Sequence, residues 1–351
     1  MPWTEWVDAQ LDAIRRADRW RAPVPRDGIR NFASNDYLGL SQHPAVIAAA
    51  HDALDKNGAG AGSARLVVGS RADHHALEDD LAEWKHTERA VLFSTGYQAN
   101  LSVLTTFGDA NTRIVSDELN HASIIDGCRL SRAEVVVYRH GDVEHAASLV
   151  AGAARAIVVT DSVFSMDGDV APLAELDALC THTGALLVVD EAHAVLGPEV
   201  ALQTTHVRVG TLSKTLGSLG GFVASSASLC DLLVNRARPY IFTTASTPAD
   251  TAAARAALAV LRSPEGEALV ARLRDHVARV RPGHPSPIVP VILGEEQAAL
   301  DAAAFMAERD LLVPAIRPPT VAPGTSRLRV ALSAAHSDDE IDRLIAALAQ
   351  L

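Results

Sequence analysis

Short, continuous apolar runs alternate with longer amphipathic stretches through the middle of the chain. Runs of Val, Leu and Ile without regular polar alternation are typical of strands that are buried on both faces. Such runs predict strands at Ala90–Ser94, Arg113–Ser116, Glu134–Tyr138, Ala156–Thr160, Ala185–Val189, Val207–Leu212 and Gly221–Ala224. Helical stretches, notably Leu173–Thr183, separate many of these runs, and this alternation predicts parallel βα units.

Helical periodicity appears before and between these strands. The first 20 residues or so predict an amphipathic helix, and a proline-broken linker follows it. A second helix is expected from Pro44 to Lys56, where Gly58 is suited to the position just after a helix end. Gly58 also begins a glycine-rich loop that runs to Gly62. Two further helices are expected, one from Asp73 onward and one at Gly96–Phe107.

A different pattern begins near Thr247, where helices and strands mix. The expected elements are helices Ala249–Arg262, Gly266–Val280 and Gln297–Asp310, strands Ile288–Leu293, Val313–Ile316 and Arg327–Leu332, and a final helix that opens with a capping box of Ser337 and Glu340. This order predicts a small α+β domain at the C-terminal end. We therefore expect three parts: an N-terminal helix and linker (1–40) that pack with the small domain, a large α/β domain (41–246) and the small domain (247–351).

Composition and charge narrow the class of protein. The chain has 351 residues, of which 48% are hydrophobic and 21% charged, so it can bury a sizeable core. Its net charge of -12 disfavours nucleic acid as a partner, because nucleic-acid binders carry a clustered basic face. Three widely spaced cysteines match no metal pattern and fit a reducing compartment. With neither a secretory signal pattern nor a long apolar run, we expect a cytoplasmic protein without metal.

Two charged residues follow predicted buried strands at a short separation. Asp190 comes directly after the run ending at Val189, and Lys214 lies 24 residues later, after the run ending at Leu212. Ligands of open α/β sheets bind at the carboxyl ends of strands. A lysine can form a Schiff base there, and a carboxylate can hold a proton on a heterocyclic nitrogen. These are the two protein groups that pyridoxal phosphate needs, so the pair predicts a site for that cofactor.

Other interpretations of these segments are weaker. The string Asp190–His193 resembles a helicase Walker B box, but the required phosphate loop lacks its second glycine and lies downstream of the acid. The glycines at 58, 60 and 62 follow a predicted helix rather than a strand, which favours a helix stop over a dinucleotide loop. Lys214 could be an ordinary surface lysine, although the small, polar residues after it would let a flat ligand approach the backbone.

Four more residues, in three segments, carry candidate chemistry. Gly96 and Tyr97 begin a helix after a strand, so their backbone N–H groups form an anion site suited to a phosphate, although the same segment could be an ordinary helix cap. His121 follows another strand and could stack on a planar cofactor or cap the next helix. His193, three residues after Asp190, could reach an oxygen of the same ligand or serve as a structural hydrogen-bonding residue.

Taken together, these motifs resemble the α-oxoamine synthases, pyridoxal-phosphate enzymes of fold type I. The matching strings are Ser34–Leu40, Ser94–Asn100, Asn120–Ser123, Val163–Asp169, Asp190–His193 and Thr211–Lys214. The segments Arg317–Val321 and Gly324–Arg329 are most similar to the branch of the family that works in biotin biosynthesis. The resemblance covers nearly the whole chain and implies a large, mostly parallel, seven-stranded sheet and a homodimer with shared sites.

The resemblance also implies roles for individual residues. Lys214 would carry the Schiff base, Asp190 would pair with the pyridine nitrogen, His193 and Ser165 would contact the ring oxygen, and His121 would stack on the ring. The implied phosphate ligands are Gly96, Tyr97, Thr211 and, from a partner subunit, Thr244. The implied substrate contacts are Asn35 and Arg329 for carboxylates, with Arg21 and Thr320 for the acyl substrate. His121 would also contact the substrate.

The activity that the resemblance implies is a decarboxylative condensation of L-alanine with a pimeloyl thioester of coenzyme A or an acyl carrier protein. A sister synthase that uses glycine or serine with another acyl-CoA, an aminotransferase and a non-enzymatic cofactor-binding protein stay open as alternatives. One departure concerns the segment after His193, which reads Ala194–Pro198 where the family continues with a longer glycine-rich loop. The region Arg281–Pro287 is also shorter than in the family.

Overall fold

The computed structural model describes residues 1–17, 19–26 and 28–351 and divides into two units, Met1–Arg30 and Asn31–Leu351. In the first unit, helix α1 (Trp3–Arg16) exposes its apolar side chains, and Trp3 and Trp6 meet edge to face with 5.5 Å between ring centroids. The expected N-terminal helix therefore forms but ends at Arg16; its predicted continuation toward residue 20 includes residue 18, which lies outside the described residues. Its packing with the small domain stays a prediction.

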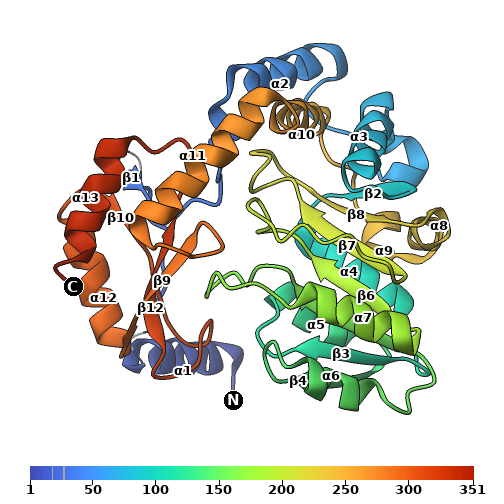
Figure 1. Ribbon diagram of the computed structural model, residues 1–351, viewed down its shortest axis with the longest axis horizontal. Helices are drawn as coiled ribbons and strands as arrows, with labels where there is room; N and C mark the ends of the chain where they lie inside the picture. The colour runs from blue at the N-terminus through green and yellow to red at the C-terminus, as the bar shows by residue number, and fades with distance from the viewer. Residues whose placement is uncertain (18, 27) are drawn as a thin grey trace. The chain divides into compact units, whose positions relative to one another are not determined.

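A seven-stranded sheet forms the centre of the second unit, in the order β2-β8-β7-β6-β5-β3-β4 (Figure 1). Strands β7, β6, β5, β3 and β4 are parallel, and β8 runs antiparallel to both β7 and β2. The strands are β2 (Arg89–Phe93), β3 (Arg113–Asp117), β4 (Glu134–Tyr138), β5 (Ala156–Asp161), β6 (Leu186–Asp190), β7 (His206–Thr211) and β8 (Gly221–Ser225). Each lies within one residue of its predicted ends, which confirms the mostly parallel α/β fold.

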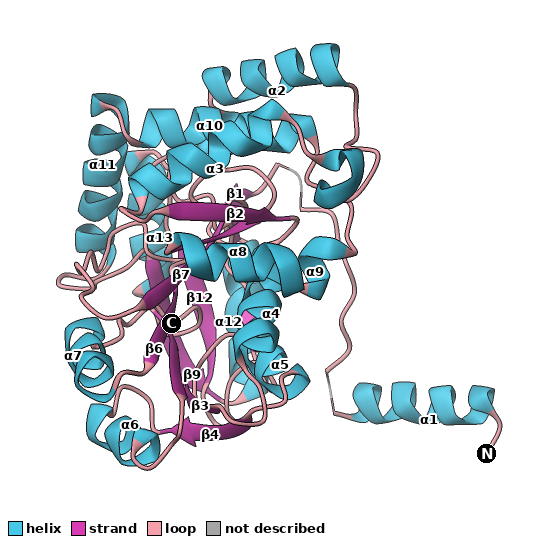
Figure 2. Cartoon of the chain, turned by 90° about the vertical axis from the view of Figure 1, so that its right-hand side faces the viewer, coloured by secondary structure: helices cyan, strands magenta, loops and turns pink. Residues whose placement is uncertain are grey.

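Helices cover both faces of this sheet because alternate strand residues are apolar on each side. On one face, Val159 and Val209 belong to a buried cluster with residues of α4 (Gly96–Phe107), α5 (Ala122–Leu130), α8 (Ala227–Arg236) and α9 (Arg238–Ile241). On the other face, Val158 and Val189 pack with α6 (Val143–Val150) and α7 (Leu173–Thr183). Figure 2 shows these helices around the strands.

A third apolar cluster joins the edge of the large sheet to the C-terminal elements. Its helices are α2 (Pro44–Asn57), α3 (Ala72–Trp84), α10 (Pro248–Leu261), α11 (Pro264–Val280), α12 (Glu296–Ala307) and α13 (Asp338–Leu348). A three-stranded antiparallel sheet is ordered β11 (Ala315–Ile316), β12 (Ser326–Ala331), β9 (Ile288–Gly294). The short elements are β1 (Arg30–Asn31), β10 (Leu311–Leu312), the 3-10 turn Leu40–Gln42 and the π-helical turn Arg65–Gly69.

The C-terminal elements follow the predicted order. The capping box of α13 is present, since Glu340 N–H donates to Ser337 Oγ and Ser337 N–H donates to Glu340 Oε2 at 2.8 Å. The strand predicted at Val313–Ile316 is shorter and covers only Ala315–Ile316. The division into large and small domains at residue 247 stays a prediction. None of the helices in the described part of the chain has the length and apolarity that a membrane span requires.

Candidate active site

The candidate residues follow strands of the large sheet, and the carboxyl ends of these strands all lie at the same end of the sheet. Asp190 ends β6 and Thr211 ends β7, and these strands are parallel neighbours. The turn to His121 follows β3, and the segment to Ser165 follows β5, both on the far side of β6. Gly96 follows β2, which is parallel to β7 because both strands pair antiparallel with β8. The topology therefore gathers the candidates where open α/β sheets bind ligands.

Lys214 lies beside two buried carboxylates. Burial lowers the pKa of its ammonium, Asp190 and Asp161 oppose that shift, and the charge of Arg329 adds to it. The lowered pKa favours a neutral amine at a lower pH than an exposed lysine allows. A neutral amine is the nucleophile that Schiff-base chemistry requires. The structure thus brings the predicted lysine and acid into one charged cluster.

Hydrogen bonds fix the carboxylate of Asp190 in one orientation. Asn100 Nδ2 donates to Oδ2 at 2.6 Å, and Ala192 N–H donates to Oδ1 at 2.9 Å. Asn100 comes from α4, so this helix both begins beside β7 and holds the acid at the end of β6. Asp190 is almost fully buried, at 6% exposure. A buried, oriented carboxylate suits a cationic group of a bound ligand better than a solvent-facing one.

His121 lies at the N-terminal end of α5 and belongs to the same network. Its Nδ1 lies 2.7 Å from Ser123 Oγ, which in turn accepts a hydrogen bond from Asn100 Nδ2 at 2.8 Å. Burial lowers the pKa of His121, the Asp190 charge raises it and the Lys214 charge lowers it. Nδ1 also accepts the Ser123 N–H, so the helix-capping role considered from the sequence is present. The stacking role stays a prediction.

His193 is buried and contacts a residue that the sequence had not singled out. Its Nδ1 lies 2.6 Å from the hydroxyl oxygen of Tyr37. Burial, together with the charges of Lys214, Arg329 and His121, holds the pKa of His193 well below its usual value, so the ring is neutral near pH 7. Burial raises the pKa of Tyr37 to about 12, which keeps its hydroxyl protonated.

The start of α4 forms a close backbone contact with β7 and β8. A side chain at Gly96 would place its Cβ 3.2 Å from Thr211 Cβ, and a Cβ at Gly221 would lie 2.5 Å from Gly96 N. The first N–H groups of a helix, here those of Gly96 and Tyr97, have no intrahelical acceptor. Thr211 Oγ1 donates to Gly220 O and accepts from Ser213 N–H. The geometry suits an anion at this helix end.

Arg329, from β12, contacts two loop residues, Ser165 after β5 and Asn35 near the start of the second unit. Its Nε donates to Ser165 O at 2.5 Å, and its Nη2 donates to Asn35 Oδ1 at 3.1 Å. Arg329 is 5% exposed, so its guanidinium is available only to a group that enters the site. These contacts bring together the two residues expected to bind carboxylates and one expected to contact the cofactor.

Two predicted residues have no contact with the cluster around Lys214 and Arg329 that the structure describes, and a third lies in the other unit of the chain. Thr244 is exposed, and its carbonyl accepts a hydrogen bond from Ser94 Oγ at 2.9 Å, two residues before Gly96. Thr320 is exposed in the turn after β11. Arg21 belongs to the unit Met1–Arg30. Their predicted roles stay predictions.

Residues that hold the site were harder to find from the sequence. Asn100 and Tyr37 lie within matching strings, but polar residues inside a helix or turn carry no signal of their own. Asp161 could have been found, because it ends β5 as Asp190 ends β6, yet the expected strand stopped at Thr160. Burial and the nearby charge of Asp190 raise the pKa of Asp161 well above its usual value.

Comparisons with known proteins agree with this geometry. The model of the family described as aminotransferase class I and II matches residues 27–348. An 8-amino-7-oxononanoate synthase of Anaeromyxobacter dehalogenans (strain 2CP-1) is 49% identical, and the match covers 98% of this chain and 95% of that protein. The structure is similar to a serine palmitoyltransferase variant from S. paucimobilis with a bound PLP–myriocin aldimine, with a TM-score of 0.91, 28% identity and coverage of 99% and 97%. An 8-amino-7-oxononanoate synthase from Francisella tularensis superposes with a TM-score of 0.78 at 26% identity, covering 93% and 98%.

Proposed function

The chain belongs to the aminotransferase class I and II family, and we propose that it catalyses the decarboxylative condensation of L-alanine with a pimeloyl thioester. The products are 8-amino-7-oxononanoate, carbon dioxide and the free thiol, and the reaction belongs to biotin biosynthesis. The chain is thus an acyltransferase with pyridoxal phosphate as its cofactor. The observation that carries the proposal is the Lys214–Asp190 pair at neighbouring strand ends, in a chain 49% identical to a synthase of that name.

The described residues fit the cofactor. An amine of lowered pKa stands beside an oriented, buried carboxylate, and α4 begins with a glycine whose backbone lies close to Thr211. Lys214 would hold the cofactor covalently, Asp190 would pair with its ring nitrogen, and Gly96, Tyr97 and Thr211 would hold its phosphate. When bound, the cofactor supplies an electron sink for the negative charge that forms at the substrate α-carbon.

Lys214 and Arg329 would act on different groups of the amino acid substrate, Lys214 on its Cα–H and Arg329 on its carboxylate. Arg329 would bind the substrate carboxylate with the donors of its guanidinium that Ser165 and Asn35 do not use, because a planar fork matches a carboxylate. This contact would orient the Cα–H of alanine toward Lys214. The lysine amine, once freed from the cofactor, would then remove that proton, since burial keeps its pKa below that of a free lysine.

His193 and Tyr37 would set the proton arrangement at the cofactor's oxygen. The Tyr37 hydroxyl lies closer to His193 Nδ1, at 2.6 Å, than to Asn35 Oδ1, at 3.1 Å. With Tyr37 donating to Nδ1, the neutral imidazole carries its hydrogen on Nε2. That hydrogen would be donated to the ring oxygen, and Ser165 would contact the same oxygen.

The remaining parts of the proposal concern the acyl substrate, the assembly and the location. Arg21 and Thr320 would contact the acyl group, and Thr244 would complete the phosphate site from a partner subunit of a homodimer. Exposed apolar side chains in the turn Arg65–Gly69, with Val67 at 72% exposure, support a surface that a second copy covers. A cytoplasmic location is supported by Cys128, Cys180 and Cys230, which are buried free thiols.

Product analysis tests the proposed function. The purified protein, loaded with pyridoxal phosphate, is incubated with L-alanine and pimeloyl-CoA, and the products are identified by mass spectrometry. We expect 8-amino-7-oxononanoate, with glycine or serine slower by roughly tenfold or more because the site discriminates one small group. Faster product formation with glycine or serine would favour a sister synthase. Conversion of the cofactor to its amine form by alanine alone would favour an aminotransferase.

A further inference from the structure

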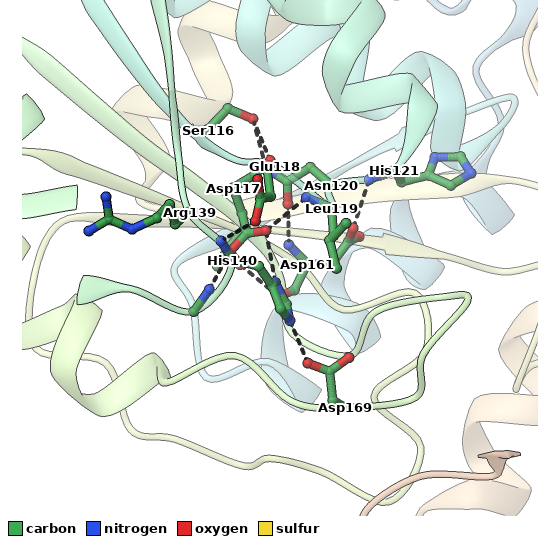
Figure 3. Close-up of polar contacts among 12 residues, drawn as sticks. Ser116, Asp117, Glu118, Leu119, Asn120, His121, Arg139, His140, Asp161 and Asp169 are labelled. Carbon is green, nitrogen blue, oxygen red and sulfur yellow. Dashed lines mark hydrogen bonds and ion pairs between the residues drawn. The ribbon is translucent and has the colours of Figure 1, made fainter. Parts of the chain in front are cut away.

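A partly buried cluster of charged side chains lies next to the candidate site without belonging to it. His140, two residues after β4, lies between two carboxylates: its Nδ1 is 3.0 Å from Asp117 Oδ1 and its Nε2 is 2.6 Å from Asp169 Oδ2 (Figure 3). The Asp117 side chain is 1% exposed and that of His140 26% exposed. Both ring nitrogens face acceptors, so the imidazole donates from both and is held as a cation. The two hydrogen bonds to Asp117 and Asp169 raise the pKa of His140 to about 10.

Asp117 shapes the turn that leads to His121. Its Oδ1 accepts from Leu119 N–H at 2.9 Å, and its carbonyl accepts from Asn120 N–H. Its Oδ2 accepts from Gly141 N–H at 3.0 Å, which ties the turn to the segment of His140. Figure 3 shows these bonds converging on Asp117 between the two segments. Both oxygens of the Asp117 carboxylate therefore accept hydrogen bonds from backbone N–H groups, and Oδ1 also accepts one from His140.

The same turn continues directly into the candidate site. Asp161 Oδ2 accepts from His121 N–H at 2.8 Å, and Asp161 N–H donates to Asn120 Oδ1 at 2.9 Å. Asn120 Nδ2 is also fixed, by Ser116 Oγ and Val159 O. The backbone of His121 is thus set by β5 on one side and by the Asp117 turn on the other.

Asp169 connects the histidine to a second segment of the site. Phe164 N–H donates to Asp169 O at 3.0 Å, and Val163 and Val170 form an antiparallel bridge, so residues 163–170 form a closed loop. Ser165 lies in this loop. The ring of Phe164 meets His140 edge to face, with 4.4 Å between centroids. His140 therefore contacts both the base of the loop and its Asp169 side chain.

We propose that His140 is a positioning residue for the reaction: between Asp117 and Asp169, it fixes the turn of His121 and the loop of Ser165 relative to each other. This inference rests on the proposed function, because that proposal places His121 against the cofactor ring and Ser165 at its ring oxygen. His140 touches neither substrate nor cofactor and acts through these two segments. Glutamine at this position keeps polar atoms but cannot donate to both carboxylates along the directions of the imidazole nitrogens, and it carries no charge.

The test compares His140→Gln with His145→Gln in the full chain loaded with pyridoxal phosphate. His145 is the matched control, because its ring accepts only from Arg139 N–H among the contacts described and reaches neither segment. Hydrogen exchange by mass spectrometry reports on peptides that cover 117–121 and 163–170, and kinetics report kcat and KM for alanine and for pimeloyl-CoA.

We expect His140→Gln to speed exchange in both peptides and to lower kcat about tenfold, with both KM values within threefold of the parent. His145→Gln should change none of these. A His140→Gln protein with parental exchange in either peptide, or with kcat lowered less than threefold, overturns the inference. If His140→Gln does not fold, the same measurements are made on Asp169→Asn and read by the same criteria, because that variant removes one of the two charged partners of His140.

The two proposals fail separately. The exchange comparison needs no substrate, so it retains its meaning if the parent protein fails to condense alanine with pimeloyl-CoA. Failure of the parent protein to condense alanine with pimeloyl-CoA would overturn the proposed function and not the positioning role of His140.

Discussion

The carboxylate of Asp190 combines deep burial with a fixed orientation. Asn100 and Ala192 each donate to one of its oxygens, and the charge of Lys214 lies nearby. A unit charge pair about 4 Å apart at an effective dielectric near 20 interacts by roughly 4 kcal/mol. An interaction of this size would be enough to keep a bound pyridine nitrogen protonated, as the proposed role of Asp190 requires.

Replacing Asp190 by Asn tests that role. Asp190→Asn keeps the shape of the side chain and loses its charge, so we expect kcat for alanine and pimeloyl-CoA to fall by roughly 10³. Asp80→Asn is the control, since Asp80 pairs with Arg255 at the surface, and it should keep parental kinetics. An Asp190→Asn enzyme within tenfold of the parent kcat would contradict the assignment.

The residues of the candidate site differ in how readily they can be identified from the sequence. Asp190 and Lys214 were predictable because strand ends in a parallel sheet are marked by the apolar runs before them. His140 was not, because its chemistry depends on Asp117 and Asp169, which are 23 and 29 residues away. Tyr37 contacts His193 across 156 residues, and no local pattern predicts such a contact.

Among the elements, the first turn of α4 depends on a close contact with β8. The N-terminus of α4 can lie against β8 only because position 221 has no side chain: an added Cβ would meet backbone atoms of Thr95 and Gly96 at 2.6 Å or less. These backbone atoms cannot move away from an added Cβ as the end of a flexible side chain can. The proposed phosphate site at the helix end would thus depend on a glycine outside the helix.

Gly221→Ala should displace the start of α4. We expect a loss of ~1–3 kcal/mol in the free energy of unfolding, as in other overpacked sites, and weaker binding of pyridoxal phosphate. Urea unfolding and cofactor titration measure the two effects. Gly60→Ala is the matched control, because nothing lies within 4 Å of an added Cβ there. Equal stability and equal cofactor affinity in the two variants would show that the contact is not tight.

The elements themselves were largely predictable. Buried parallel strands are continuous apolar runs, and these runs set the strand ends to within one residue. The segment around Val313 was less clear, because short edge strands beside prolines depend on their partner: Ala315 and Ile316 pair with Leu328 and Arg327 of β12. The order of strands in the sheet, with β8 antiparallel between β2 and β7, depends on long-range pairing that periodicity does not encode.

Across the whole molecule, buried and half-buried histidines predict how stability depends on pH. Burial lowers the pKa of four histidines outside the candidate site: His74, His276, His284 and His336. These rings bind protons more readily when the chain unfolds, so they lower stability as the pH falls below about 6.5. His140 has the opposite sign: its contribution is complete below about 6.5 and is lost as the pH rises toward its folded pKa of about 10.

Thermal unfolding of the full chain between pH 5 and pH 10 checks this balance. We expect Tm to decline on both sides of a maximum near neutrality, and the alkaline decline to be smaller in His140→Gln. The acid decline should be the same in both proteins, because the four neutral histidines are unchanged. An identical alkaline decline in parent and variant would show that the paired imidazolium does not contribute.

Covalent attachment of the cofactor gives the most direct test, because the proposed chemistry requires it at one position. The chain has three lysines, Lys56, Lys85 and Lys214, so the two others serve as internal controls. The protein is loaded with pyridoxal phosphate, reduced with borohydride and digested, and the labelled peptide is identified by mass spectrometry. We predict the label on Lys214 and its loss in Lys214→Ala. A label on Lys56 or Lys85, or none on the parent protein, would contradict the account.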